Sequence, residues 1–244
     1  YAELISANLY RLEKGALYYD LENYYDENKI VRIKADPALS PNANSQKYFK
    51  EYRKAKVAES MLGELIEQSE QELAYLESVI DSVNRADGYT ELAEIRNELY
   101  EQGYLKRAKN DKTKKAKPMP PMEYVSDDGY TILVGRNNVQ NDILTFKTAA
   151  KDDSWFHTQK IPGSHVVVIG NGDIIPEQTC RQAAILAAYH SGGRESSQVA
   201  VDYTEVRALK KPSGAKPGKV IYHTYNTMWV TPDRELCERL KKKK

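Results

Sequence analysis

A long heptad pattern is the feature that most restricts how this 244-residue chain can fold. Steps of four and three residues from Tyr48 to Val83 meet eleven positions, of which only Glu59 and Ser69 are polar. An apolar seam kept up for about five heptads is typical of a coiled coil rather than of a helix inside a globular core. The pattern stops at Asp87, which Gly88 follows, so we predict one long helix before that point.

A second, shorter helix is expected to fold back on the first. Residues 90–106 carry Leu92, Ile95 and Leu99 at the same spacing, which predicts an antiparallel partner. The seam of the longer helix continues beyond the reach of this partner. We therefore expect a helix upstream of Tyr1, or another molecule such as a second copy of the chain, to cover the remainder.

The segments on either side of the helices divide the chain further. Residues 1–44 have a helix end and two strand candidates for a small hairpin, and the start at Tyr1 rather than methionine predicts a natural N-terminus upstream. Residues 107–121 are rich in lysine and end in prolines, which predicts an exposed linker. The expected organisation is therefore an end of a preceding domain (1–44), a coiled coil (45–106), a basic linker (107–121) and a C-terminal module (122–244).

The C-terminal module has short strands and turns mixed with helices. Ser126-Asp127-Asp128-Gly129 predicts a hairpin turn, and strands are expected around the aromatic residues 154–158 and at 166–169, 199–203, 220–225 and 227–230. A short helix is predicted from Asp142 to Ala150 with Asn141 as its N-cap, and a longer one from Pro176 to His190 with a small-residue face. Because these elements lack a regular βαβ order, we predict an α+β fold: a long antiparallel helical coiled coil followed by a mixed α/β module.

Composition restricts the class of protein. The mean hydropathy is −0.68 and no apolar run approaches the roughly 20 residues of a membrane span, so no such span is predicted. Two cysteines without Cys-x-x-Cys spacing do not make a disulfide framework, which favours a reducing compartment. Residues 104–122 hold 7 Lys or Arg against 1 Asp or Glu, whereas residues 45–103 hold 7 against 13. This segregation favours a polyanion partner, although a lysine-rich linker can equally be a solvated spacer.

Two segments have the composition of phosphate-binding loops. Residues 135–142 join a predicted strand to a helix and include Arg136 and Asn137, which are suited to a phosphate group. The alternative is that these Asn and Asp residues only cap and turn the chain. Residues 206–219 carry five cations and no acid, among them Lys210, Lys211, Lys216 and Lys219. Such a loop can follow a sugar-phosphate backbone or be solvated.

An aromatic stretch lies between the two loops. Trp155 and His157 fall on a predicted strand, and a Pro162-Gly163 turn returns the chain toward Ser164 and His165. Trp155 and His157 either stack on nucleotides or shape a pocket, or the aromatics are simply core. The four histidines and two cysteines show no metal-ligand spacing, and no nucleophile elbow is present. We therefore predict no metal, no cofactor and no catalytic residues, with a zinc or nucleophilic enzyme as the minor alternative.

Three motifs together resemble the NFACT family. They are Gly-Arg-Asn-x-x-Gln-Asn-Asp at 135–142, Asp-x-Trp-Phe-His at 153–157 and Pro-Gly-Ser-His-Val-Val at 162–167, preceded by the coiled coil and basic linker. Residues 40–50 and 94–99 also resemble that family's middle coiled coil. The resemblance covers nearly the whole chain and identifies it as the family's C-terminal half, with an RNA-binding domain at its end.

The resemblance implies ribosome-associated quality control. Family members bind the large ribosomal subunit through its rRNA and recruit alanyl-tRNA, so that a stalled nascent chain gains a C-terminal alanine tail. Cytoplasmic, ribosome-associated localisation is the corresponding expectation, and a non-enzymatic role is predicted for this part. The resemblance also implies an alternative, because streptococcal members have been described as cell-surface adhesins that bind fibronectin.

Overall fold

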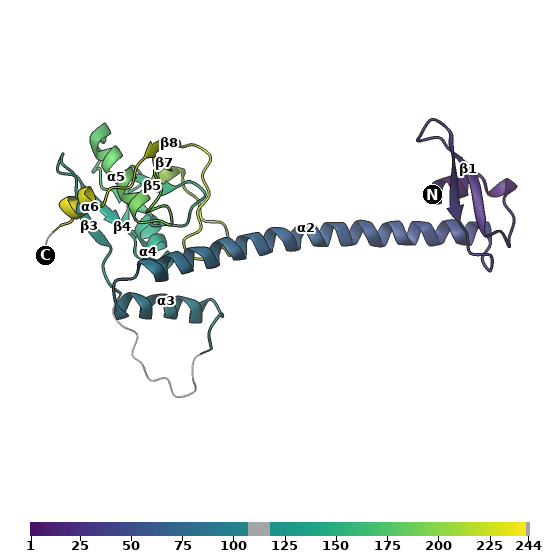
Figure 1. The fold of residues 1–244 in the computed structure, drawn as a ribbon, viewed down its shortest axis with the longest axis horizontal. Coiled ribbons are helices and arrows are strands. Elements are labelled where there is room, and N and C mark those ends of the chain that lie inside the picture. The colour runs from purple at the N-terminus through teal and green to yellow at the C-terminus, as the bar shows by residue number, and fades with distance from the viewer. Residues whose placement is uncertain (107–117, 243–244) are drawn as a thin grey trace. The chain divides into compact units, whose positions relative to one another are not determined.

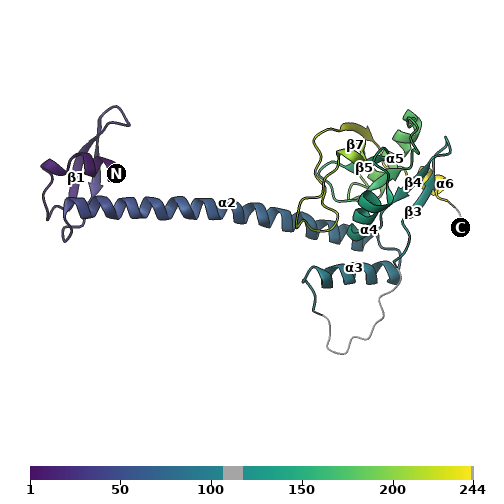
Figure 2. The ribbon, with the colours of Figure 1, turned by 180° about the vertical axis from the view of Figure 1, so that it is seen from behind.

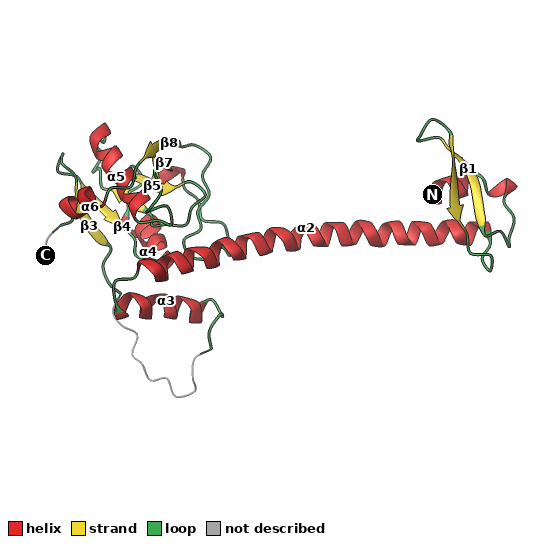
Figure 3. Ribbon diagram, viewed as in Figure 1, coloured by secondary structure: helices red, strands yellow, loops and turns green. Residues whose placement is uncertain are grey.

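The computed structural model describes residues 1–106 and 118–242, so most of the predicted linker at 107–121 lies outside the described residues. The chain forms two compact units, Tyr1–Glu70 and Gln71–Lys244, and the helix α2 (Pro41–Arg85) contains the boundary between them (Figure 1). Helices and antiparallel sheets occur together, which confirms the predicted α+β class (Figure 3). No helix among the described residues has both the length and the apolar character needed to cross a membrane.

The N-terminal unit contains the predicted small hairpin. Its elements are α1 (Ala2–Ala7), η1 (Leu9–Arg11), β1 (Tyr18–Asn23), β2 (Lys29–Lys34) and the first part of α2. The two strands pair antiparallel, and the turn between them is closed by Glu27 and Asn28 in the left-handed conformation, with φ of 49° and 59°. A small core of Leu4, Ile5, Leu21 and neighbouring residues holds the helix against the strands.

The short helix α3 (Tyr89–Glu101) folds back along the end of α2, as the sequence predicts. Tyr75 and Val79 of α2 pack with Ile95 of α3, and the Tyr75 hydroxyl donates to Glu98 at 2.9 Å. This helix pair lies within the C-terminal unit.

The face of α2 that packs differs from the predicted seam by one residue. The buried row is Tyr75, Val79 and Ser82, whereas Leu73 and Ile80 of the seam are 57% and 60% exposed. The C-terminal module accounts for the difference, because Asn138 donates to Ser78 and Ser164 accepts from Arg85 on the packed side. Leu76 of the seam still packs against the cluster that α3 shares, so α3 covers the seam only in part. The prediction that another helix or molecule covers the seam stays open.

The C-terminal module is built on one six-stranded antiparallel sheet with the strand order β3-β4-β6-β5-β7-β8. The strands are β3 (Met122–Val125), β4 (Thr131–Val134), β5 (Ser154–Thr158), β6 (Val166–Val168), β7 (Val199–Glu205) and β8 (Asn226–Val230). The predicted hairpin at Ser126–Gly129 is confirmed by the β3–β4 pairing. The aromatic strand β5 lies between β6 and β7, at the centre of the module.

Five helical segments surround the sheet. They are α4 (Asn138–Ile143), the π-helical segment η2 (Leu144–Thr148), α5 (Glu177–Tyr189), η3 (Val206–Ala208) and α6 (Arg234–Leu240). The sequence placed the first helix too late, because Asn137 rather than Asn141 caps it by accepting from the Gln140 amide. Residues 220–225 form no strand, and only Ile221 pairs, with Lys210. The C-terminal helix α6 was not predicted. It lies beside β3 in both views (Figure 1, Figure 2), and Lys241, directly after it, pairs with Tyr124 of β3.

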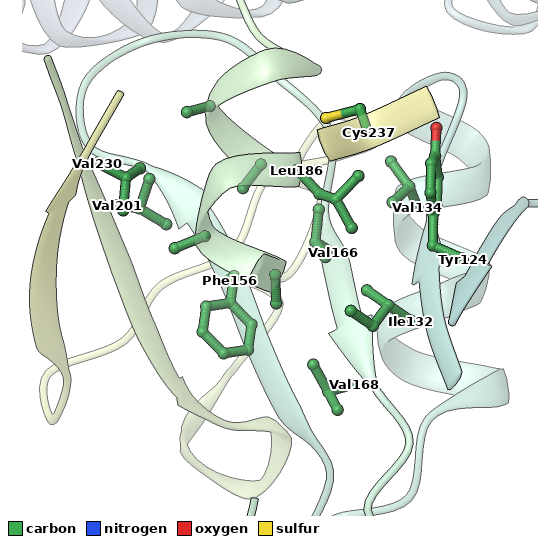
Figure 4. Packing of buried hydrophobic residues seen from close by; sticks show 14 of the residues in the cluster. Tyr124, Ile132, Val134, Phe156, Val166, Val168, Leu186, Val201, Val230 and Cys237 are labelled. Atoms are coloured by element: carbon green, nitrogen blue, oxygen red, sulfur yellow. The ribbon is translucent and has the colours of Figure 1, made fainter. Parts of the chain in front are cut away.

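The two faces of the sheet are covered differently. On one face Phe156, Val166 and Val168 pack under α5, whose alanines allow a close approach of helix and sheet (Figure 4). On the other face Trp155 and Val167 pack under η2 and the chain that follows β7. Successive strand residues alternate between these faces, so Trp155 and His157 share the second one.

Candidate nucleic-acid interface

A cavity of about 320 Å³ lies over the second face of the sheet, within the C-terminal unit. Its volume falls at the lower end of the range for ligand pockets. The end of α2 forms one wall, and β5 and the turn after it form the floor. Residues 206–219, called the basic loop from here on, form the rim. The lining includes Gln71, Tyr75, Ser78, Asn138, Asn141, Trp155, His157, Lys160, His165, Lys216, Gly218, Lys219 and Tyr222.

Four rings line the cavity: those of Trp155, His157 and His165 at its floor and that of Tyr222 at its wall. Trp155 and His157, two residues apart on β5, are stacked with centroids 5.7 Å apart and planes 9° from parallel. His165 meets both rings edge-on, at 5.2 Å from Trp155 and 5.4 Å from His157. Tyr222, which directly follows the neck of the basic loop, meets Trp155 at 5.2 Å. Trp155 is fully buried and His157 only half-buried, so His157 is the ring of the stacked pair that is open to a ligand.

This geometry decides between the two predicted roles of Trp155. A side chain with 0% exposure cannot be a direct stacking surface, so Trp155 shapes the pocket and supports His157. Its indole N–H is the one buried side-chain polar atom among the described residues that has no hydrogen-bond partner. A buried donor without an acceptor is unfavourable, and native structures contain few such groups.

Burial keeps the imidazoles of the floor neutral. Desolvation lowers the pKa of His157, and it lowers the pKa of His165 well below the ordinary value, with the nearby His157 adding to the shift. The His165 Nδ1 shares a hydrogen bond of 2.7 Å with the Thr145 hydroxyl, and its amide donates to Asn141 at 3.0 Å. The floor is therefore an uncharged aromatic surface, and Thr145 and Asn141 hold its His165 in place.

The basic loop is fixed at its base and along its length. Lys210 and Ile221 exchange two backbone hydrogen bonds of 2.9 Å, which close the neck of the loop. Asp142 of α4 accepts from the Lys211 ammonium and, at 3.1 Å, from the Gly218 amide. The loop is consequently held over the cavity rather than extended into solvent.

The four predicted lysines of this loop have different surroundings. Lys211 is paired with Asp142, and Lys216 lies over the rings of Tyr75 and Tyr104, at 5.4 and 4.8 Å from their centroids. Lys210 and Lys219 are exposed and make no ion pair within the described residues. Three of the four ammonium groups are thus free of carboxylates, and Lys216 and Lys219 line the cavity.

Arg136 and Asn137 have a different role from the predicted one. The Arg136 guanidinium pairs with Glu91 and donates to the Pro120 carbonyl, and the Asn137 amide donates to Glu94 at 2.8 Å. Asn137 is also 2% exposed. Both side chains are therefore engaged in fastening the β4–α4 loop to α3, which corrects the predicted phosphate contact at this loop.

Several lining residues were not predicted from the sequence. Tyr75 was assigned no role, Lys160 sits in the turn with φ of 56°, and Tyr222 was placed on a strand that does not form. The sequence did offer a hint for Lys160, since it lies two residues before Pro162 in the predicted Pro162-Gly163 turn. Tyr75 and Tyr222 reach the cavity only through tertiary packing.

Comparisons with known proteins agree along the chain. A model of the NFACT N-terminal and middle domains matches residues 1–118, and a model of the NFACT protein RNA binding domain matches residues 121–224. The chain is 44% identical over 245 residues to the "Rqc2 homolog RqcH" of Bacillus subtilis, and 46% identical over 242 residues to the protein of that name from Streptococcus pneumoniae.

Both alignments cover nearly all of this chain, 99% and 98%, but only 42% and 43% of the relatives' lengths. The chain thus spans less than half of the curated relatives that it matches. Among solved structures, the C-terminal part of the fibronectin/fibrinogen-binding protein from Streptococcus suis is similar, with a TM-score of 0.77 and 39% identity. That match covers 98% of this chain and 85% of the solved one.

Proposed function

This chain belongs to the NFACT family, and from that premise we propose that its C-terminal module binds RNA as part of a ribosome-associated quality-control factor. The observation that carries the proposal is the basic loop held over an aromatic cavity. Free ammonium groups beside a stacking surface are the usual combination in proteins that bind single-stranded nucleic acid. The description of the matched domain as RNA binding and the relatives named RqcH support the same conclusion.

We further propose that the RNA partners are tRNA and the large ribosomal subunit. In this proposal the full-length protein recruits alanyl-tRNA for alanine tailing of stalled nascent chains in the cytoplasm. The part described by the structure contributes binding rather than catalysis. Lys210, Lys216 and Lys219 contact phosphates, and Lys211 contributes through its position in the loop.

The test is binding of the chain to tRNA across a salt series. Each phosphate that a lysine neutralises adds about 0.7 to 0.9 to the slope of log affinity against log salt. Replacing Lys210, Lys216 and Lys219 with Gln should therefore lower the slope by roughly 2 to 3. A matched control replaces three exposed lysines of α2, namely Lys50, Lys54 and Lys56, with Gln. It changes the net charge by the same amount as the loop variant.

The control separates a specific loop from a general effect of charge. If both triple variants reduce the slope equally, the basic loop is not the RNA surface. If the wild-type chain shows no salt-dependent tRNA binding at all, the RNA proposal for this module is wrong.

A second function is favoured by one observation, the similarity to a solved fibronectin/fibrinogen-binding protein. We propose as the alternative that the chain binds fibronectin at the cell surface. An interface with a protein lacks the steep counterion dependence of RNA binding. Fibronectin binding that persists at high salt, without tRNA binding, would favour this alternative.

A further inference from the structure

We propose that the cavity over β5 takes one unstacked nucleobase of a single-stranded RNA, which lies on His157 while its phosphates meet Lys216 and Lys219. The inference rests on the proposed RNA function and specifies how this site performs it. Its starting point is the presence of a cavity under the loop, since a loop that follows only phosphates needs none. The volume of about 320 Å³ admits a single base with its sugar, not a stacked duplex.

The floor offers the surface that a base requires. His157 is half-buried, and Trp155 lies parallel beside it on β5, so the imidazole is held by a ring that is itself fully buried. Because desolvation lowers its pKa, the imidazole is neutral at physiological pH and presents a π-face rather than a charge. Stacking on a neutral ring tolerates any base, which is how single-stranded nucleic acids are commonly held.

The walls provide hydrogen-bonding groups at the edge of that surface. Asn138, Asn141 and Ser78 line the cavity, and the two amides are held in place because Asn138 donates to Ser78 and Glu98 and Asn141 accepts from the His165 amide. The edge of a base carries both hydrogen-bond donors and acceptors, whereas a phosphate offers only acceptors. A base lying on His157 would therefore meet polar side chains of the wall at its edge.

The cations lie at the rim rather than at the floor. Lys216 is held over Tyr75, and the exposed Lys219 is three residues further along the loop. Gly218, which lines the same cavity, is fixed between them by its bond to Asp142. Separating an uncharged floor from a cationic rim matches the two halves of a nucleotide, a planar base and a charged phosphate.

The first test compares two ligands with the full 244-residue chain. One is a short single-stranded oligoribonucleotide, and the other is its abasic counterpart with the same number of phosphates. The chain should bind the base-containing strand about tenfold more tightly, as expected for one stacked base. If neither strand binds, the RNA function itself fails; if both bind equally, only the base pocket is wrong.

Fluorescence locates the base. The chain has two tryptophans, and Trp229 is 60% exposed on β8, so Trp229→Phe leaves Trp155 as the single reporter. Adenosine monophosphate should quench Trp155 emission to saturation, whereas ribose 5-phosphate at the same concentrations should leave it unchanged. Equal responses to the two compounds would overturn the proposal, because they share the phosphate and differ in the base.

Variants of the histidine complete the test. His157→Ala should abolish the preference for the base-containing strand, and His157→Phe should retain it because the flat ring remains. His223→Ala, which removes an exposed histidine outside the cavity, should bind like the wild type. A preference unchanged in His157→Ala contradicts the proposal; if that variant does not fold, the Trp155 titration of the otherwise wild-type chain decides.

Discussion

The two faces of the six-stranded sheet are made by alternate residues of the same strands, yet they differ in chemistry. Under α5 the face is closed, with Phe156, Val166 and Val168 in one apolar cluster. On the opposite face Trp155 begins an equally buried cluster, but His157 on the same side borders a cavity. The face under α5 therefore contributes only to stability, whereas part of the opposite face borders the proposed binding site.

The difference between the two covers explains how a small sheet can have both a packed core and a binding site. A helix with a small-residue face covers its side completely, whereas an irregular loop covers only part of the other side. The loop is held by few groups, chiefly the neck at Lys210 and the carboxylate of Asp142. Substitutions on the two faces should consequently separate stability from binding.

The largest effect is expected for Phe156→Ala, on the closed face. Removing a fully buried phenyl ring should lower the free energy of unfolding by about 3–5 kcal/mol, measured by urea denaturation. His157→Ala, the next residue on the opposite face, should lower it by about 1 kcal/mol or less because the ring is half-buried. Similar losses for the two variants would show that the faces do not divide these tasks.

Acid should be the condition to which both faces respond alike. His190, which packs beside the α5 face against Tyr124, has its pKa lowered to about 3 by burial, with Arg85 and Arg194 adding to the shift. His165 on the cavity face is also shifted down by burial. A histidine that is buried neutral contributes stability above its unfolded pKa of about 6.5, and that contribution is lost as pH falls toward its folded pKa.

The loss should reach up to about 1.4 kcal/mol per pH unit for each histidine, or about 2 kcal/mol between pH 6.5 and 5. Urea unfolding of the Trp229→Phe chain, followed through Trp155, reports on the C-terminal module. His190→Gln should reduce the loss of stability on acidification by the amount that one buried histidine contributes. An unchanged pH dependence in this variant would mean that His190 is protonated equally in the folded and unfolded states.

A smaller effect on stability is expected for a substitution at Gly218 in the basic loop. Gly218 has φ of 81°, and a Cβ added there would lie 2.8 Å from the Asn138 Oδ1. Asn138 cannot easily move, because its amide donates to Ser78 and Glu98. Gly218→Ala should lower stability by about 1–2 kcal/mol and also weaken RNA binding by displacing Lys216 and Lys219. Gly214→Ala, in the same loop, is the control: its φ of 72° is similar, but nothing lies within 4 Å of an added Cβ, so it should change RNA binding little.

Local patterns predicted the closed face well and the open one poorly. The strand alternation through residues 154–158 and 166–168 and the alanine face of α5 depend on neighbours in sequence, and these elements were predicted within a few residues. The cavity joins Tyr75, His157 and Tyr222, which lie far apart along the chain. No local periodicity encodes such a meeting, so only the individual residues Trp155, His157 and the loop lysines were found.

The two predicted phosphate loops show a second limit. Residues 135–142 and 206–219 both look suited to an anion, since each has a cation and turn-forming residues. The first is buried because Glu91 and Glu94, about 45 residues upstream, supply the anionic partners from within the chain. The second has two acidic partners among the described residues, Glu205 for Arg207 and Asp142 for Lys211, and its other three cations stay free of carboxylates. Composition cannot tell whether an anion will come from the same molecule or from another.

The smallest expected effect tests whether the wall of the cavity needs its polar atom. The Tyr222 hydroxyl donates to Asp202 at 2.9 Å, but Asp202 also accepts from Thr227 at 2.7 Å, so Tyr222→Phe leaves no orphaned carboxylate. The loss of stability should therefore stay below about 1 kcal/mol in urea denaturation. The ring edge against Trp155 remains, and affinity for the oligoribonucleotide should be unchanged, whereas Tyr222→Ala should weaken it by opening the wall. Equal binding losses in both variants would mean that the hydroxyl, rather than the ring, positions the ligand.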